Sequence, residues 1–189
     1  HMEHSGFYLS TEIKNDISCA YNMESEESVE LPIFDVPAGA IYSTVEDMSK
    51  FGKAFLNNGN PILKPETIEL MFDIQNKEIR LDLLDKSAIC FNLKNKAGEL
   101  GRVLEHGGAT MYHRAELYIA PDAKIGGVML SNSPQGVKNA WKLNEQFMVE
   151  YIKQHAIDVK PNTIPEKSFD FISIKDKNLK SYVGDYVMP

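Results

Sequence analysis

The segment best suited to chemistry is residues 104–110, in which His106 is followed directly by Gly107 and Gly108. An imidazole can donate, accept or carry a proton near neutral pH. Glycine has no Cβ, so another molecule can lie flat against its backbone N–H and C=O groups. We therefore expect one wall of a binding site here, at a strand that stops at the two glycines. The other walls are expected outside this chain.

The other reactive side chains do not have the spacing of a known site. His106 and His113 have no Cys, Asp or Glu at a recognisable ligand spacing, so no metal site is predicted. Glu105 and Glu116 resemble an acid/base pair, but carboxylates at strand edges are usually solvated, and we interpret them as surface residues. A self-contained Ser-His-Asp triad would need a Gly-x-Ser-x-Gly turn, which the sequence does not contain. No motif predicts a cofactor.

The two cysteines, Cys19 and Cys90, show no paired spacing of a metal or redox motif. Unpaired cysteine behaves as a small apolar residue, so this pattern favours two buried thiols. A disulfide stays open, because sequence alone does not bring two thiols together. The cellular compartment is therefore not decided by the cysteines.

Composition sets limits on the partners. The chain has 189 residues, of which 43% are apolar and 25% charged, and its net charge is −7. That charge argues against a nucleic-acid partner, which would need a basic surface to displace counterions. No apolar run approaches the roughly 20 residues of a membrane-spanning helix, so no transmembrane segment is expected. His1-Met2 is typical of a cloning remnant, and we expect native sequence upstream of it.

Two helices are predicted in the first half. Ser43 and Glu46 have the spacing of a capping box, and residues 57–59 (Asn-Asn-Gly) give a left-handed stop. The second helix begins at Pro65, a residue that suits the first helical position, and runs to Phe72. By contrast, residues 5–22 carry few signals and are expected to be weakly structured.

Strands are predicted in the second half, over residues 88–93, 102–105, 115–120 and 125–130. Residues 115–120 alternate apolar and polar side chains, as in a strand with one buried face. Residues 125–130 are apolar throughout, which favours a central strand covered on both faces.

A third helix, over residues 137–155, is predicted to pack its apolar stripe across this sheet. The fold class is therefore α+β: an antiparallel sheet with a long C-terminal helix on one face and short helices at the side. Residues 1–156 form the main unit, and residues 157–189 begin with a linker. The stripe consists of Ala140, Trp141, Phe147, Met148, Tyr151 and Ile152.

Two blocks of the sequence occur in the same order as two motifs of a known family. Residues 37–48 (Pro-Ala-Gly-Ala-Ile-Tyr-Ser-Thr-Val-Glu-Asp-Met) are similar to a "PAGG-small-ST-x-x-D" helix start, and His106-Gly107-Gly108 with the following strands and residues 131–133 (Ser-Asn-Ser) resembles a third motif. Both resemblances are to the serine β-lactamase and penicillin-binding-protein family, in the branch with class C β-lactamases, D-Ala-D-Ala carboxypeptidases and esterases. Residues 179–189 are similar to the opening of a small β domain that often follows in such proteins.

The chain departs from this family at its nucleophile. The family serine lies in a Ser-x-x-Lys motif, whose lysine helps to remove the serine proton. No serine of this sequence has lysine three residues later, and residues 11–14 (Thr-Glu-Ile-Lys) are interpreted as a coincidental mimic. The second motif, Tyr-x-Asn, is also missing, since Tyr21-Asn22 has the wrong spacing. Both motifs precede these blocks in the family, so we expect the nucleophile upstream.

The resemblance implies roles for four residues of the third motif. His106 would give polar contact to the substrate or to the catalytic tyrosine, and Gly107 and Gly108 would allow close approach. The amide of Ala109 would be one of two oxyanion-hole donors, the other being the amide of the nucleophile. The plain structural alternative is an exposed histidine at a strand end followed by a glycine turn.

The resemblance also implies a function. The intact protein would be a serine hydrolase that cleaves a β-lactam, a D-Ala-D-Ala peptide or an ester through an acyl-enzyme, without a cofactor, outside the cytoplasm. This chain alone would be inactive. The alternative is a non-catalytic module that retains the cleft wall and binds a ligand or partner. A chain without the upstream strands would expose an apolar edge, so self-association is expected.

Overall fold

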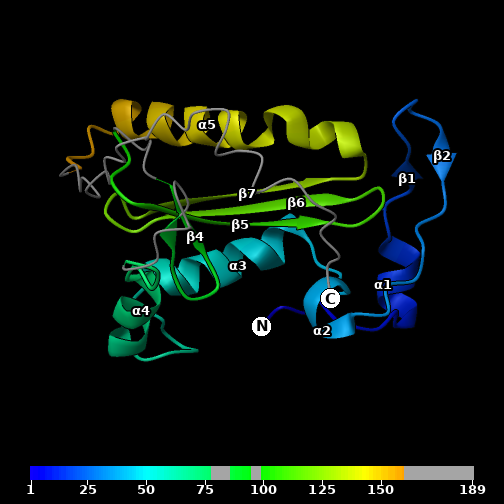
Figure 1. The fold of residues 1–189 in the computed structure, drawn as a ribbon, viewed down its shortest axis with the longest axis horizontal. Coiled ribbons are helices and arrows are strands. Elements are labelled where there is room, and N and C mark those ends of the chain that lie inside the picture. The colour runs from blue at the N-terminus through cyan, green and yellow to red at the C-terminus, as the bar shows by residue number, and fades with distance from the viewer. Residues whose placement is uncertain (78–85, 95–98, 160–189) are drawn as a thin grey trace, which may run out of the picture.

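The computed structural model describes residues 1–77, 86–94 and 99–159. Within them, five antiparallel strands form one sheet in the order β3-β4-β5-β6-β7. The long helix α5 crosses one face of the sheet, and helix α3 crosses the opposite face with α4 beyond it (Figure 1). The strands are β3 (Lys86–Ser87), β4 (Asn92–Lys94), β5 (Val103–Ala109), β6 (Arg114–Ala120) and β7 (Ile125–Ser131).

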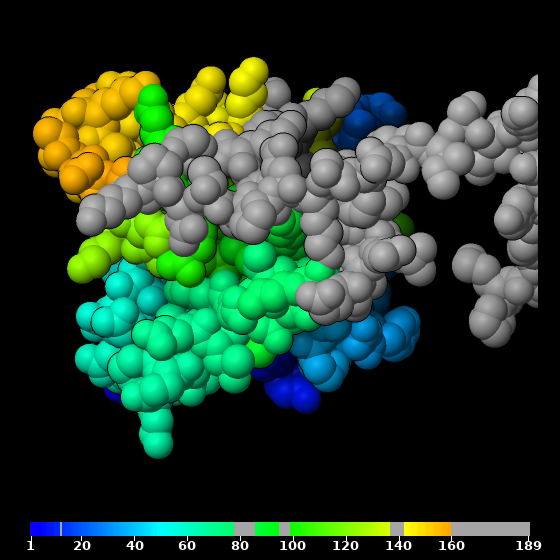
Figure 2. Space-filling view, turned by 60° about the vertical axis from the view of Figure 1, so that its left-hand side comes forward, coloured from blue at the N-terminus to red at the C-terminus, as the bar shows by residue number. Residues whose placement is uncertain are grey.

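The helices that cover the sheet are α3 (Val45–Leu56), α4 (Pro65–Phe72) and α5 (Ala140–Gln154), which follows the 3-10 turn η1 (Pro134–Asn139). Figure 2 shows the end of α5 in orange and the α3–α4 unit in cyan and blue-green at opposite edges of the same molecular face. The predicted α+β class, with a long C-terminal helix on one face of an antiparallel sheet, is confirmed.

The N-terminal part forms small elements beyond one end of the sheet (Figure 1). Residues 11–14, expected to be weakly structured, lie in the short helix α1, because the Ser10 hydroxyl accepts a hydrogen bond from the Ile13 amide. The remaining elements are α1 (Thr11–Asp16), the antiparallel pair β1 (Ala20–Tyr21) and β2 (Glu27–Ser28), and α2 (Val36–Gly39).

Each face of the sheet has its own hydrophobic core. On the α3 side, Leu104 and Ile119 are fully buried among residues of α3 and α4. On the α5 side, Val103 and Tyr118 pack with Met148 of α5. Because successive residues of a strand point to opposite faces, β5 and β6 contribute alternate side chains to the two cores. This fixes the direction of every side chain farther along these strands.

The two predicted N-terminal helices are confirmed, with one correction. The N-cap of α3 is Thr44, whose hydroxyl accepts a hydrogen bond from the Asp47 amide at 3.2 Å. Ser43, the expected cap, instead forms a hydrogen bond with the Ser5 hydroxyl at 2.8 Å. The left-handed stop is present, since Asn58 has a φ of 53° and Gly59 a φ of 86°.

Three expectations about the strands are wrong. Strand β5 does not stop at its glycines but continues through them to Ala109. Strand β7, expected in the centre, is the outer strand of the described sheet. Strand β6 buries both faces over residues 117–120, because α3 and α5 lie on opposite sides of it. Continuous burial replaces the alternation that its sequence predicts.

The stripe on α5 is only partly buried. Met148 and Ile152 are buried, whereas Phe147 is 72% exposed and Tyr151 is 48% exposed. The side chains of residues 137–141, including Trp141, lie outside the described part, as does the tail from residue 160 onward. The boundary at residues 156–157 therefore stays a prediction. Cys19 and Cys90, expected to be buried, are both free thiols exposed to solvent.

Candidate functional site

The predicted site residues lie along an edge of β5. Strand β4 pairs only with residues 103–105, whereas β6 pairs with residues 104–109. Within the described ranges, no strand therefore pairs with residues 106–109 on the side away from β6, and we call this side the open edge. His106, Gly107, Gly108 and Ala109 are all exposed, although Val103 and Leu104 of the same strand are buried.

The hydrogen-bonding register determines which backbone groups face the open edge. The Thr110 amide donates to the His113 carbonyl at 3.0 Å, so these two residues form a hydrogen-bonded antiparallel pair. Such pairs alternate with non-bonded ones. Gly108 and His106 therefore bond to β6, whereas the N–H and C=O groups of Ala109 and Gly107 point away from it. The Ala109 amide thus points to the open edge.

The side chain of His106 lies on the α3 side of the sheet. It is two residues beyond Leu104, which packs in the core on that side. A methyl group built on Gly108 would lie 3.5 Å from the Ala115 Cβ, an ordinary contact, so packing does not require glycine there. His106 therefore projects from the same face as α3, next to the amides of the open edge.

Two carboxylates, one from β5 and one from β6, lie on the face of the sheet opposite to His106. Glu105 forms an ion pair with Lys94 at 2.9 Å, and its side chain is only 13% exposed. A methyl group built on Gly107 would lie 3.0 Å from Glu116 Oε1. Burial raises the pKa of Glu116, and the nearby charge of Glu105 raises it further. The expectation of a solvated surface group is therefore wrong for Glu105, and Glu116 is half-buried.

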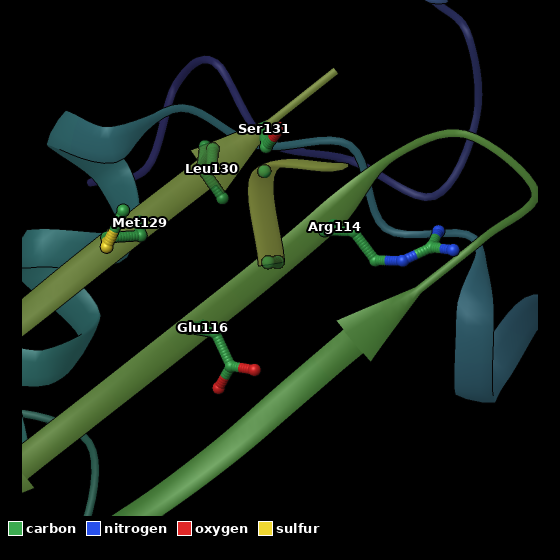
Figure 3. Close-up of a pocket in the computed structure, with 7 residues that line it drawn as sticks. Arg114, Glu116, Met129, Leu130 and Ser131 are labelled. Atoms are coloured by element: carbon green, nitrogen blue, oxygen red, sulfur yellow. The ribbon is translucent and has the colours of Figure 1, made fainter. Parts of the chain in front are cut away.

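A small hollow near the end of this hairpin does not coincide with the open edge. Its lining includes Arg114 and Glu116 of β6 and Met129 and Ser131 of β7 (Figure 3). By the register these four residues lie on the same face of the sheet as Tyr118, which packs against α5. His106 points to the other face of the sheet. The hollow is therefore separate from the predicted site.

The turn between β5 and β6, residues 110–113, is held by Glu30. The Glu30 carboxylate accepts hydrogen bonds from Thr110 Oγ1 at 2.8 Å and from the amides of Met111 and Tyr112 at 3.1 and 3.2 Å. It also contacts His113 Nδ1 at 2.8 Å. The turn immediately follows Ala109, so these bonds hold the end of the open edge in place.

A third residue joins this group. Ser18 Oγ lies 3.2 Å from His113 Nε2. The sequence offers no signal for the cluster, because Ser18, Glu30 and His113 are separated by long stretches without a shared motif. In the described ranges, no three His, Cys, Asp or Glu side chains are arranged to hold a metal ion. No helix there is both long and apolar enough to span a membrane.

The sheet with its two helical layers and the histidine-glycine edge defines a β-lactamase-type fold. The family model "Beta-lactamase" matches residues 1–162, and the chain belongs to this family. A comparison with curated proteins gives no match.

Solved structures show the same fold. A class C β-lactamase in complex with cefoxitin is 14% identical over 79% of this chain, with a TM-score of 0.62. The octameric penicillin-binding protein homologue from Pyrococcus abyssi is 20% identical over 82% of this chain, with a TM-score of 0.57. A class C β-lactamase from Rhodobacter sphaeroides is 11% identical over 79% of this chain, with a TM-score of 0.60.

The chain spans about half the length of these class C structures, covering 49% of the cefoxitin complex and 50% of the Rhodobacter enzyme. It covers 38% of the Pyrococcus homologue. The described chain thus has the fold of a serine hydrolase of the β-lactamase family over the part that carries the third motif.

Proposed function

We propose that this chain forms one wall of the active site of a serine hydrolase that works through an acyl-enzyme. The observation that supports this is the open edge, where the amides of Gly107 and Ala109 point outward beside the exposed His106. In this proposal His106 gives polar contact to the substrate or to the catalytic tyrosine. Gly107 and Gly108 allow close approach, and the Ala109 amide donates to the oxyanion.

The nucleophile of the proposed reaction lies outside this chain, because none of its serines has lysine three residues later. One oxyanion donor lowers the barrier by about 3 kcal/mol, but only when a nucleophile is placed to attack. The chain alone is therefore inactive on the family's substrates. Those substrates are amides or esters such as β-lactams and D-Ala-D-Ala peptides.

A fluorescent penicillin tests the proposal. The intact protein, read from the open reading frame upstream of residue 1, should contain Ser-x-x-Lys followed by Tyr-x-Asn and should be labelled at that serine. The present chain should stay unlabelled. If the upstream reading frame lacks both motifs, the enzyme assignment fails. A binding module that retains the cleft wall would then account for the open edge.

We further propose that this chain self-associates through its N-terminal unit, residues 1–42. Large apolar side chains are exposed there: Phe34 is 94% exposed, Val29 83% and Tyr8 80%. Reciprocal backbone hydrogen bonds between Gly6 and Tyr42 join the two ends of this segment. Exposed apolar surface of this kind favours association.

Sedimentation velocity over a wide concentration range tests the association. The weight-average mass should rise with concentration, and Phe34→Ser should reduce that rise. Phe147→Ser is the matched control, because Phe147 is also largely exposed but lies on α5. A monomeric profile at every concentration contradicts the proposal.

A further inference from the structure

A second group of residues has the geometry of a nucleophilic serine site. Ser18 Oγ lies 3.2 Å from His113 Nε2, and His113 Nδ1 lies 2.8 Å from Glu30 Oε2. Serine, imidazole and carboxylate thus form a continuous chain of contacts. Nothing in the family's chemistry described above uses these residues.

The hydrogen bonds of Glu30 determine which nitrogen of His113 carries the proton. Burial raises the pKa of Glu30, but bonds from His113, Thr110, Tyr112 and Met111 outweigh it and hold that pKa below its usual value. Glu30 is therefore a carboxylate, which only accepts hydrogen bonds. It accepts a hydrogen bond from the N–H at His113 Nδ1, and in the neutral imidazole Nε2 is then the acceptor that faces the Ser18 hydroxyl.

Both sides of the contact are anchored to the sheet. On the histidine side, the His113 amide donates to Thr110 Oγ1 at 3.0 Å, within the turn that Glu30 binds. On the serine side, Asn132 Nδ2 donates to the Cys19 carbonyl at 2.8 Å, and the Tyr21 amide donates to the Asn132 carbonyl at 2.9 Å. The residues next to Ser18 are thereby fixed to the end of β7.

We propose that Ser18 is a second nucleophile in this protein, with His113 as its general base and Glu30 as the residue that positions the base. A serine hydrogen-bonded to a histidine that a third group orients is the arrangement that activates a hydroxyl for attack. Ser18 is exposed, so the reagent reaches it from solvent. The chemical class it accepts is the activated ester or the fluorophosphonate, whose leaving groups depart as stable anions.

The proposed step with a fluorophosphonate balances as follows. Ser18 Oγ attacks phosphorus while its proton moves to His113 Nε2. The new O–P bond forms as the P–F bond breaks, and fluoride leaves with the bonding electron pair. His113 then returns its proton to solvent. The reaction needs no oxidant, reductant or metal, and it is independent of the serine proposed upstream.

A labelling experiment with the 189-residue chain tests this site. The chain is treated with a fluorophosphonate, and the labelled serine is identified by peptide mass spectrometry as a function of time. Ser25, an exposed serine on the same N-terminal unit, is the internal reference. A general base contributes about 10²- to 10⁴-fold, so Ser18 should react at least about 100-fold faster than Ser25.

Three variants separate reactivity from folding. Ser18→Ala should abolish the fast label, and His113→Ala should reduce Ser18 to the rate of Ser25, with added imidazole restoring the fast reaction. Glu30→Gln keeps a single acceptor oxygen, which can serve either the Met111 amide or the Tyr112 amide, because these two bond to different carboxylate oxygens. It should slow labelling of Ser18 about tenfold, and its unfolding temperature is measured alongside to separate lost reactivity from lost stability. Equal rates for Ser18 and Ser25 in the wild-type chain would overturn the proposal, as would a fast label that persists in His113→Ala.

Discussion

The direction of the backbone amides along β5 gives the sharpest prediction. The register makes the Gly108 amide a partner of β6 and leaves the Ala109 amide facing the open edge. Proline removes a backbone N–H without adding a donor. Gly108→Pro and Ala109→Pro therefore make the same chemical change at neighbouring positions, with different consequences.

The magnitudes follow from the bonds that each substitution removes. Gly108→Pro loses a ladder bond of about 1 kcal/mol and leaves the Ala115 carbonyl unsatisfied at about 1–3 kcal/mol, so the free energy of unfolding should fall by about 2–4 kcal/mol. Ala109→Pro loses no ladder bond, and the fall should stay within about 1 kcal/mol. Gly108→Ala is the control, because its methyl group would lie 3.5 Å from the Ala115 Cβ without a clash.

Urea unfolding followed by circular dichroism measures these differences, and amide hydrogen exchange tests their cause. The amides of His106 and Gly108 should exchange slowly, and those of Gly107 and Ala109 quickly. If Ala109→Pro is as destabilising as Gly108→Pro, or if the Ala109 amide is protected, the register argument is wrong. The assignment of Ala109 as an oxyanion donor would then be lost as well.

Three further predictions concern stability. Hydrogen bonds from Lys50, together with those from Ser5 and His4, hold the pKa of Asp47 at about 2 despite burial, so the stabilisation it provides is complete above its ordinary pKa of 3.8 and is lost as the pH falls toward 2. Thermal unfolding between pH 5 and about 2 should show this loss in the wild-type chain and a flatter profile in Asp47→Asn. Leu104→Ala should lower the free energy of unfolding in urea by about 2–5 kcal/mol, because Leu104 is fully buried between the strands and α3. Gly127→Ala should destabilise the chain, since its methyl group would collide with the buried side-chain amide of Asn144, and calorimetry should show a smaller loss when Asn144 is alanine.

The sequence predicts the helices well where local signals agree. Pro65 begins α4 and the residues Asn58-Gly59 end the helix before it, because proline and left-handed backbone act within a single turn. The shift of the α3 cap from Ser43 to Thr44 has a nonlocal cause. Ser43 is bonded to Ser5, a contact that no local pattern reveals.

Strand environment is harder to predict, because it depends on which elements cover each face. The apolar run of β7 suggests a central strand, yet β7 is the outer strand of the described sheet, with α3 and α5 on its two faces. An outer strand whose two faces are covered by helices has the same apolar composition as a central strand whose two faces are covered. The glycines of β5 are misleading for a similar reason. They do not end the strand, because the hydrogen-bonded pairing with β6 continues through them to Ala109.

The two candidate sites differ in how far sequence could find them. Residues 106–109 are contiguous, so a motif identifies them, and the structure adds only the direction of their amides. Glu30 and His113 come from distant segments, and their contact exists because the N-terminal unit lies against the turn of the β5–β6 hairpin. Sequence spacing carries no information about such a contact.

The same contact links the two sites. Ala109, at the end of the open edge, is followed at once by Thr110, whose hydroxyl and neighbouring amides bond to Glu30. The position of the Ala109 amide therefore depends on a carboxylate from the N-terminal unit as well as on the ladder with β6. An oxyanion donor must be held in place before the reaction, since its contribution comes from dipoles that need no rearrangement. Glu30 thus serves both arrangements through one turn, by orienting His113 and by restraining the backbone that carries the proposed donor.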